Sequence, residues 1–366
     1  MHISINREEL IKPLGIVSGV VERRQTLPIL SNILLRYNNN QLVLTGTDME
    51  VEVSAMVQSS GGQPGDITVP ARKLHDICRA LPVDSLLDIK LDKEKVLIKS
   101  GKSRFRLLTM PATEFPVIET ANWETKIALP QNKLRWLLEK TMFCMAQQDV
   151  RYYLNGLLIE TKGKQLRAVA TDGHRLALAN VELASSAETE RFVILPRKGV
   201  QEMLRFLEDS DSEVVIQVGA NHIRVTQKDL VFTSKLIDGR FPDYNKVIPT
   251  TQSKRLTIQR PMFRETLNRA AILSNEKYRG VRFGLSSDLM TITAHNPEQE
   301  EAQEEIPIDY NGENMEIGFN VNYISEAIGA LASDKIEFCL NDPNSSCLLR
   351  SPENNNLLYV VMPMRL

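Results

Sequence analysis

The 366-residue sequence lacks the short motifs that mark many enzymes and metalloproteins. It has no G-x-x-x-x-G-K-[ST] phosphate loop, no G-x-G-x-x-G, no H-E-x-x-H and no G-x-S-x-G. The five histidines show no metal-ligand spacing. We therefore expect no catalytic residue, no metal site and no cofactor.

Cysteine is scarce, and so are long apolar runs. The four cysteines form no C-x-x-C pair, which predicts four reduced thiols rather than a disulfide framework. The start, MHISINREEL, has no signal-peptide pattern, and no apolar run reaches the length of a membrane span. These absences predict a cytoplasmic protein without a membrane partner.

Charge of one sign is not in excess. The chain has 44 Lys and Arg residues against 46 Asp and Glu residues, a net charge of −2. A protein that simply coats nucleic acid is usually more basic. A balanced total still allows nucleic-acid binding, because the placement of charges matters more than their sum. The length predicts two or three domains.

What the sequence does contain is an internal repeat. Blocks 30–57, 154–183 and 278–308 share a strand, a polar turn, a second strand and a polar break. The polar break falls at Asp48, Asp172 and Asn296, which are 124 residues apart at each step. Helix-like periodicity flanks every block. The windows that carry it are 7–24, 72–79, 131–146, 197–208, 260–272 and 320–332.

The repeat predicts an α+β fold made of three tandem copies of one helix-strands-helix-strands domain. The expected boundaries are 1–122, 123–248 and 249–366, which fall in polar or proline-containing stretches. Because the strands come in consecutive hairpin-like runs, the sheets should be mainly antiparallel.

The segment TDGHRL, residues 171–176, is the most chemically suggestive part of the repeat. Its aspartate recurs in the other copies, so we expect it to cap its own turn by accepting backbone N–H groups. Gly173, His174 and Arg175 occur in the middle copy alone. Three interpretations remain open from the residues themselves: catalysis by Asp172, His174 and Arg175, a polar surface loop, or one wall of a binding groove.

The charges are unevenly placed. Basic residues outnumber acidic ones in five of the six helical windows, which fits either solvated helix faces or a lining that meets phosphates. Residues 99–106 form a basic segment and residues 296–305 an acidic one. These segments could attract each other between two chains, or they could protect exposed strand edges against aggregation.

Several longer segments resemble one family. They are TLPIL (26–30), QDVRYYLNG (148–156), ATDGHRLA (170–177), PRKG (196–199), DGRFPDY (238–244), AAILSNEK (270–277), NPEQEEA (296–302) and YVVMPMRL (359–366). Through them the whole chain resembles the bacterial sliding clamps, the beta subunits of DNA polymerase III. The resemblance implies the DNA-clamp fold and a head-to-tail homodimeric ring that slides on duplex DNA and has no catalytic activity. Rival hypotheses are an enzyme at residues 172–175 and a triplicated scaffold that never encircles DNA.

The resemblance also implies three sets of site residues. Those expected to face DNA without reading its sequence are Arg24, Arg72, Lys73, Lys133, Gln148, Arg197 and Lys198. Those expected at the dimer interface are Lys99, Lys102, Arg104, Phe105 and Leu107 against Ile272, Leu273, Glu298, Glu300, Glu301 and Glu304. Those expected to line a peptide-binding groove are Leu154, Thr171, Gly173, His174, Arg175, Leu176, Pro242, Val247, Asn320, Tyr323, Ser346, Val360, Met362, Pro363, Met364 and Arg365.

The implied partners of the groove are short peptides of the polymerase III catalytic subunit, the clamp loader, other polymerases and mismatch-repair proteins. Its apolar residues suit an apolar anchor, and methionine adapts to varied ligands. We expect Arg175 and Arg365 to hold polar or acidic peptide groups at the rim. Lys246, Asn344 and Cys347 depart from the family pattern and should alter peptide preference at one edge.

Overall fold

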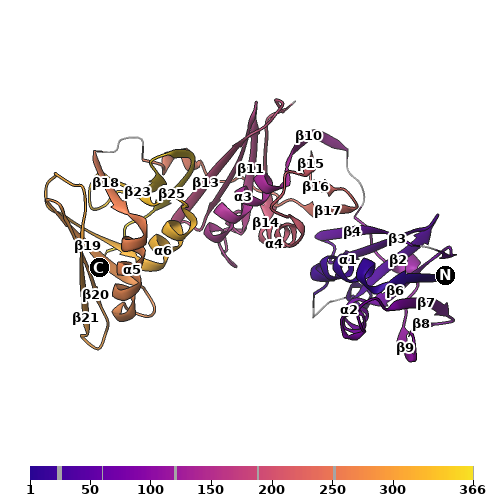
Figure 1. Cartoon of the computed structure of the whole chain (residues 1–366). Helices are drawn as coiled ribbons and strands as arrows, with labels where there is room; N and C mark the ends of the chain where they lie inside the picture. The colour runs from indigo at the N-terminus through magenta and orange to yellow at the C-terminus, as the bar shows by residue number, and fades with distance from the viewer. Residues whose placement is uncertain (23–26, 60, 119–121, 188, 250–252, 366) are drawn as a thin grey trace. The chain divides into compact units, whose positions relative to one another are not determined.

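The repeated blocks fold as helices packed on antiparallel sheets in a computed structural model of the chain (Figure 1). The structure describes residues 1–22, 27–59, 61–118, 122–187, 189–249 and 253–365. All six predicted helices are confirmed in this part of the chain, and five of them end earlier than predicted. They are α1 (Arg7–Val20), α2 (Ala71–Ala80), α3 (Gln131–Thr141), α4 (Arg197–Phe206), α5 (Arg260–Ala270) and α6 (Val321–Ala330).

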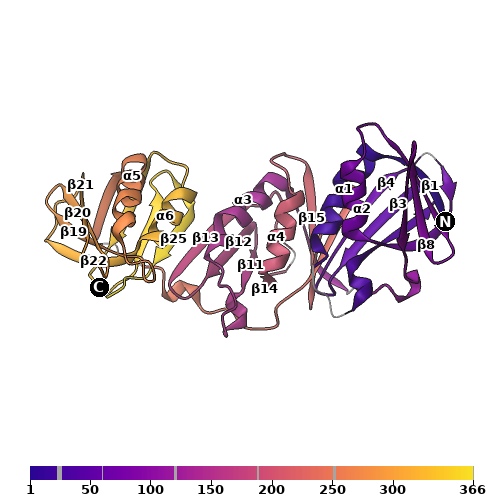
Figure 2. The same cartoon turned by 90° about the horizontal axis from the view of Figure 1, so that it is seen from below.

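Helix α1 illustrates why these segments become helical. Leu10, Leu14 and Val17 recur on one face and are fully buried, and this face packs on strands β3 and β4. Glu8 and Glu9 lie in the first turn, where carboxylates interact favourably with the helix dipole. Figure 2 shows α1 beside α2, and α5 beside α6 in the last third of the chain.

The first compact unit comprises Met1–Arg135, Leu183–Arg191 and Leu195–Ile237. A five-stranded sheet in it has the order β5-β1-β7-β8-β9. An eight-stranded sheet has the order β10-β15-β16-β17-β4-β3-β2-β6. The strands are β1 (His2–Asn6), β2 (Asn32–Asn38), β3 (Gln41–Thr47), β4 (Val51–Gln58), β5 (Gly62–Gln63), β6 (Gly65–Pro70), β7 (Leu86–Asp92), β8 (Lys95–Ser100), β9 (Ser103–Leu108), β10 (Trp123–Pro130), β15 (Glu213–Gly219), β16 (His222–Gln227) and β17 (Leu230–Lys235).

The second compact unit comprises Trp136–Glu182, Phe192–Ile194 and Asp238–Leu366. Its four-stranded sheet has the order β21-β20-β19-β22, and an eight-stranded sheet has the order β14-β11-β12-β13-β25-β24-β23-β18. The strands are β11 (Gly156–Lys162), β12 (Gln165–Thr171), β13 (Arg175–Glu182), β14 (Arg191–Pro196), β18 (Lys254–Gln259), β19 (Gly280–Ser286), β20 (Leu289–His295), β21 (Glu301–Pro307), β22 (Met315–Asn320), β23 (Lys335–Leu340), β24 (Cys347–Ser351) and β25 (Asn354–Val361).

Each eight-stranded sheet joins strands from two neighbouring copies of the repeat. Strand β4 of the first copy pairs antiparallel with β17 of the second, with Val53 opposite Phe232. Strand β13 of the second copy pairs antiparallel with β25 of the third, with Leu178 opposite Leu358. The predicted α+β class and antiparallel pairing are therefore confirmed. The residue boundaries of the three domains stay a prediction, because the copies share sheets.

The core of the last copy is aromatic. Phe263 of α5 lies against Phe283 of β19 and Phe338 of β23, with ring centroids 5.9 and 6.2 Å away. All three side chains are fully buried. Packing of this kind adds to the free energy gained from apolar burial alone.

The repeated polar break is the turn that the sequence predicts. Asp48 Oδ1 accepts the N–H groups of Glu50 and Val51 at 2.9 and 2.7 Å. Asp172 Oδ1 accepts those of the corresponding residues, His174 and Arg175, at 2.9 and 3.0 Å. In the third copy Asn296 Oδ1 accepts the N–H of Glu300 at 2.8 Å. The recurring side chain therefore closes its own turn in every copy.

No helix in the described part of the chain is long and apolar enough to cross a membrane.

Candidate functional site

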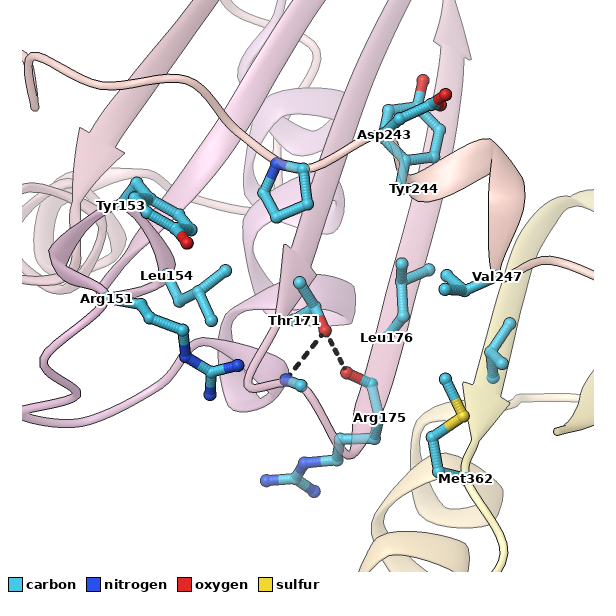
Figure 3. Close-up of a pocket in the computed structure, with 13 residues that line it drawn as sticks. Arg151, Tyr153, Leu154, Thr171, Arg175, Leu176, Asp243, Tyr244, Val247 and Met362 are labelled. Atoms are coloured by element: carbon cyan, nitrogen blue, oxygen red, sulfur yellow. Dashed lines mark hydrogen bonds between the residues drawn. The ribbon is translucent and has the colours of Figure 1, made fainter.

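An apolar cavity of about 190 Å³ opens in the second unit beside the TDGHRL turn. Leu154 and Arg151 lie on one side of it and Val247 and Met362 on the other (Figure 3). It is formed by four segments: the turn before β11, the end of β12 with the start of β13, the loop 242–247, and the end of β25. The predicted groove residues that line it are Leu154, Thr171, Gly173, Arg175, Leu176, Pro242, Val247, Val360 and Met362.

The turn holds its wall of the cavity rigidly. Thr171 Oγ1 donates to the carbonyl of Arg175 at 2.7 Å and accepts the N–H of Gly173 at 3.1 Å (Figure 3). Gly173 has a φ of +89°, which is easy for glycine and strained for most other residues. A side chain there would also meet the Arg151 guanidinium at 3.0 Å. The first copy has Met49 at the corresponding position with a φ of +76°, so the conformation recurs, and the contact with Arg151 is what favours glycine in the middle copy.

Arg175, expected to hold peptide groups at the rim, already has partners within the chain. Its Nε donates to Asp172 at 3.1 Å, its Nη2 donates to the Phe143 carbonyl at 2.7 Å, and its Nη1 pairs with Glu326. Its guanidinium carbon lies 4.6 Å from the centre of the Tyr323 ring. Only 11% of the side chain is exposed. The guanidinium therefore connects the turn to helix α6, and its charge is already neutralised.

The same contacts oppose the catalytic interpretation of residues 172–175. Both carboxylate oxygens of Asp172 accept hydrogen bonds, Oδ1 from the turn and Oδ2 from Arg175. The ring of His174 stacks on Tyr323 with centroids 6.3 Å apart. A general base needs a free lone pair directed at a substrate proton, and three of the four lone-pair directions of this carboxylate already accept hydrogen bonds within the chain.

Four residues that line the cavity were not predicted from the sequence: Arg151, Tyr153, Asp243 and Tyr244. Arg151 forms a bidentate pair with Asp149 at 3.0 and 2.8 Å, and this pairing lowers the pKa of Asp149 to about 2. The hydroxyl of Tyr244 accepts from Arg167 at 2.6 Å and donates to the buried Glu160. Burial and that bond to Glu160 raise the pKa of Tyr244. The adjacent motifs QDVRYYLNG and DGRFPDY were the available signal.

The remaining predicted groove residues do not line the cavity. His174 accepts the N–H of Met362 at 2.8 Å through its carbonyl. Ser346 donates to the Val247 carbonyl at 3.2 Å. Asn320 caps α6, and Met364 and Arg365 line a second hollow on the four-stranded sheet. Tyr323 touches the site through His174 and Arg175, and Pro363 lies between the two methionines of the tail.

One of the three departures from the family pattern cannot affect peptide preference directly. Cys347 is completely buried in β24, and burial raises the pKa of its thiol. Lys246 is exposed and pairs with Asp243 at 3.6 Å, next to the cavity. The backbone N–H of Asn344 donates to Asp342 at 2.8 Å in an exposed turn. Cys347 does not contact a ligand directly, because its strand position directs the side chain into the core, and its effect on peptide preference stays a prediction.

The residues expected to face DNA occupy several different elements. Arg72 and Lys73 begin α2, Lys133 lies in the first turn of α3, and Arg197 and Lys198 begin α4. Gln148 is exposed in the second unit, with a φ of +54°. Arg24 lies outside the described residues.

Lys198 already has two acidic partners. Its ammonium donates to the carboxylates of Glu22 and Asp48. Burial lowers the pKa of Lys198, but the bonds to Asp48 and Glu22 outweigh burial and raise it. Asp48 therefore caps its turn with Oδ1 and holds a cation from the middle copy with Oδ2.

Comparisons with known proteins agree with this geometry. Residues 1–119, 128–243 and 245–365 match the N-terminal, central and C-terminal domains of the DNA polymerase III beta subunit. The chain is 52% identical to a beta sliding clamp of Pseudomonas aeruginosa and 47% identical to one of Escherichia coli K12, and each alignment covers 100% of both chains. A crystal structure of the P. aeruginosa polymerase III beta subunit matches at a TM-score of 0.98, with 52% identity and full coverage of both chains.

The chain belongs to the DNA polymerase III beta-subunit family. Sliding clamps of this family are processivity factors that encircle DNA, and this function applies to the chain. The resemblance and the three-copy clamp fold inferred from the sequence are thereby confirmed.

Two strand edges of this sliding-clamp chain lie at the ends of their sheets. Strand β9 ends the five-stranded sheet and β21 ends the four-stranded sheet, and no described strand covers their outer edges. Phe105 and Leu107 lie on β9. Ile272, which is 74% exposed, lies in the turn after α5.

The acidic residues expected at the dimer interface lie at β21. One of them, Glu304, already forms a bidentate pair with Arg269 at 2.8 Å. The other members of the expected interface are Lys99 on β8, Lys102 and Arg104 at β9, Leu273 beside Ile272, and Glu298, Glu300 and Glu301 at the start of β21.

Proposed function

We propose that two copies of the chain form a closed ring around duplex DNA and that the cavity beside the TDGHRL turn docks short peptides of replication and repair proteins. The observation that carries the proposal is the cavity itself. Apolar side chains from two neighbouring copies of the repeat meet there beside an ordered turn, and this arrangement suits a leucine or phenylalanine anchor.

The partners proposed for this groove are the catalytic subunit of polymerase III, the clamp loader, other polymerases and mismatch-repair proteins. The chain acts in the cytoplasm as a non-catalytic subunit of the holoenzyme. Its three domains run over 1–122, 123–248 and 249–366. Closure of the ring supplies processivity, so no phosphate contact needs to be tight.

The dimer proposal rests on the two sheet edges. An edge strand offers unpaired N–H and C=O groups to another strand, and the β9 edge is basic where the β21 edge is acidic. Because the two edges differ, the contact is head to tail and closes into a ring when the geometry permits. The basic side chains on β8 and β9 then meet the glutamates of a second copy.

The DNA proposal rests on the basic residues at the starts of α2 and α4 together with Lys133 of α3 and Gln148. Lysine and arginine contact phosphates without reading base sequence, which a sliding ring requires. Arg24 is added to these proposed DNA contacts because the resemblance to the sliding clamps implies it.

Removal of Met364–Leu366 tests the groove. Binding of a fluorescent peptide from the polymerase III catalytic subunit should be lost, while native mass spectrometry still shows the dimer. Unchanged peptide affinity would refute the assignment.

Retention on DNA tests the ring. A loaded protein should remain on a nicked circle and leave after linearisation, since a ring runs off a free end. Equal loss from both forms would favour the scaffold that never encircles DNA.

A further inference from the structure

A second hollow, of about 440 Å³, lies on the outer face of the four-stranded sheet in the second unit. Along β19, Val281 and Phe283 point into the core, while Gly280 and Arg282 face this hollow. A neighbouring hollow of about 390 Å³ shares Arg282 and Thr293 with it and continues along β19 and β20. Together they form a trough. The glycines and threonines that line it have short side chains, so little side-chain volume fills this face of the sheet.

The lining of the 440 Å³ hollow is cationic. It contains the two arginines Arg282 and Arg365 and, among the described residues, no aspartate or glutamate, while His295, which also lines it, lies 3.9 Å from the Glu301 carboxylate. This contrasts with the chain as a whole, which has a net charge of −2. Arg282 makes a long contact of 3.5 Å with Glu316, at a site where both side chains are exposed. Such a pair is weak and exchanges readily with another carboxylate.

Its remaining wall is aromatic and held in place. Tyr278 is 57% exposed and forms one side of the hollow. The Asn275 side chain accepts the N–H groups of Lys277 and Tyr278, both at 2.9 Å. Asn320 donates to the Tyr278 carbonyl at 3.2 Å. The wall is therefore preorganised, which reduces the entropy cost of binding.

The C-terminal tail connects this hollow to the apolar cavity. Met362 lines the cavity, whereas Met364 and Arg365 line the hollow. Two residues of extended chain span about 7 Å. The tail is fixed at both sites, because Met362 donates its N–H to His174 at 2.8 Å and Met364 donates to Gly318 at 2.9 Å. One bound peptide can therefore reach both places.

We infer that the hollow binds acidic side chains of the docking peptide, a few residues away from its apolar anchor. The inference rests on the proposed function, in which the apolar cavity receives that anchor. Arg282 and Arg365 would pair with the peptide carboxylates, and Tyr278 would pack against the peptide chain. A partner with an acidic flank would thus bind more tightly than one with a neutral flank.

Peptide titrations by fluorescence anisotropy test this inference. The probes are a core peptide from the polymerase III catalytic subunit and the same peptide extended by three glutamates at either end. Matched probes carry three glutamines at the same positions. At low salt, glutamates at one end should tighten binding about threefold to tenfold relative to glutamines, and added salt should reduce the gain.

Three variants locate the effect. Arg282→Gln should remove most of the gain, and Glu316→Gln should increase it because Arg282 loses its internal partner. Arg264→Gln removes the same charge from an exposed position on α5 outside the hollow and should retain the gain. All three should bind the core peptide as the native chain does.

The outcomes separate the two proposals. If the core peptide binds but glutamates and glutamines have equal effects at both ends, the acidic subsite is absent and the groove stands. The subsite is likewise absent if Arg282→Gln and Arg264→Gln reduce the gain equally. If the core peptide itself does not bind, the groove assignment fails and the subsite fails with it.

Discussion

The guanidinium of Arg175 lies 4.6 Å from the centre of the Tyr323 ring and connects two copies of the repeat at the cavity. Arg175 begins β13 in the middle copy, and Tyr323 belongs to α6 in the last copy. The ring of Tyr323 in turn stacks on His174. Cation–π contact and ion pairing therefore hold the two sides of the groove in register.

Replacing this arginine should damage both stability and binding. In Arg175→Gln the carboxylates of Asp172 and Glu326 lose their cation, so the free energy of unfolding should fall by about 2 kcal/mol. Peptide affinity should fall about tenfold, because Tyr323 and the turn lose their common support. Urea unfolding and peptide titration measure the two effects.

Arg350→Gln is the matched control. Arg350 pairs with Glu337 at 2.7 Å and is similarly shielded, but it does not line the cavity. It should lower stability and leave peptide affinity unchanged. Equal peptide affinities for the Arg175 and Arg350 variants would contradict a positioning role for Arg175.

Lys198 should contribute to stability as well as to DNA association. Its partner Asp48 has only 6% of its side chain exposed, so Lys198→Gln should lower the free energy of unfolding by about 1 kcal/mol or more. Lys73→Gln removes a charge from an exposed position on α2 and should leave stability unchanged. Both variants should weaken DNA association. If the Lys198 variant is as stable as the native chain, the pair with Asp48 makes no net contribution to the free energy of unfolding.

Glu52 should make stability depend on pH in a defined direction. Burial raises the pKa of Glu52, although the N–H of Ile118, at 2.9 Å, and the charge of Arg224 act in the opposite sense. Because the pKa is raised in the folded state, the contribution of Glu52 to the free energy of unfolding is fully present at pH values below its pKa in the unfolded state. This contribution is lost as the pH rises through its pKa in the folded state. Relative to the native chain, Glu52→Gln should therefore gain stability between about pH 4 and pH 7.

Urea unfolding at several pH values checks the Glu52 prediction. Glu50→Gln removes the same charge from an exposed neighbouring position and controls for the change in net charge. A constant difference between native and Glu52→Gln proteins across this range would contradict the prediction.

Charged replacements of Ile272 and Leu273 should produce monomers. Ile272 is among the most exposed large apolar side chains of the described chain, which is expected of a residue that becomes buried in an assembly. Burying two unpaired carboxylates in Ile272→Glu/Leu273→Asp would cost more than the interface gains. Native mass spectrometry at micromolar concentration should show one chain instead of two. Val83→Glu changes another exposed apolar residue and should leave the dimer intact.

The repeat made much of the fold predictable. The 124-residue spacing and the helical periodicity located all six helices, and the recurring Asp48, Asp172 and Asn296 identified the turn in each copy. These are local properties: an amphipathic face and an Asx turn are set by residues within a few positions of one another. The identity of the family was likewise available from contiguous motifs.

The site was less predictable, because side-chain partners are distant in sequence. TDGHRL could be recognised as a wall of the groove, but the sequence could not show that Arg175 turns toward Glu326, 151 residues away. Nor could it show that Lys198 pairs with Asp48 or that Cys347 faces the core. Arg151, Tyr153, Asp243 and Tyr244 were missed because only packing brings them to the same cavity.

The sequence by itself therefore determined the family, the three-copy plan, the helices and the repeated turn, since each depends on neighbouring residues or on a pattern that repeats. Tertiary structure decided which charges remain available to a ligand. Strand pairing between copies, as in β13 with β25, places Arg175 against Tyr323 and leaves Arg282 beside an open hollow. A lysine or arginine stabilises the fold when tertiary structure places a carboxylate of the same chain beside it, and it remains available to bind a partner when no such carboxylate pairs with it tightly.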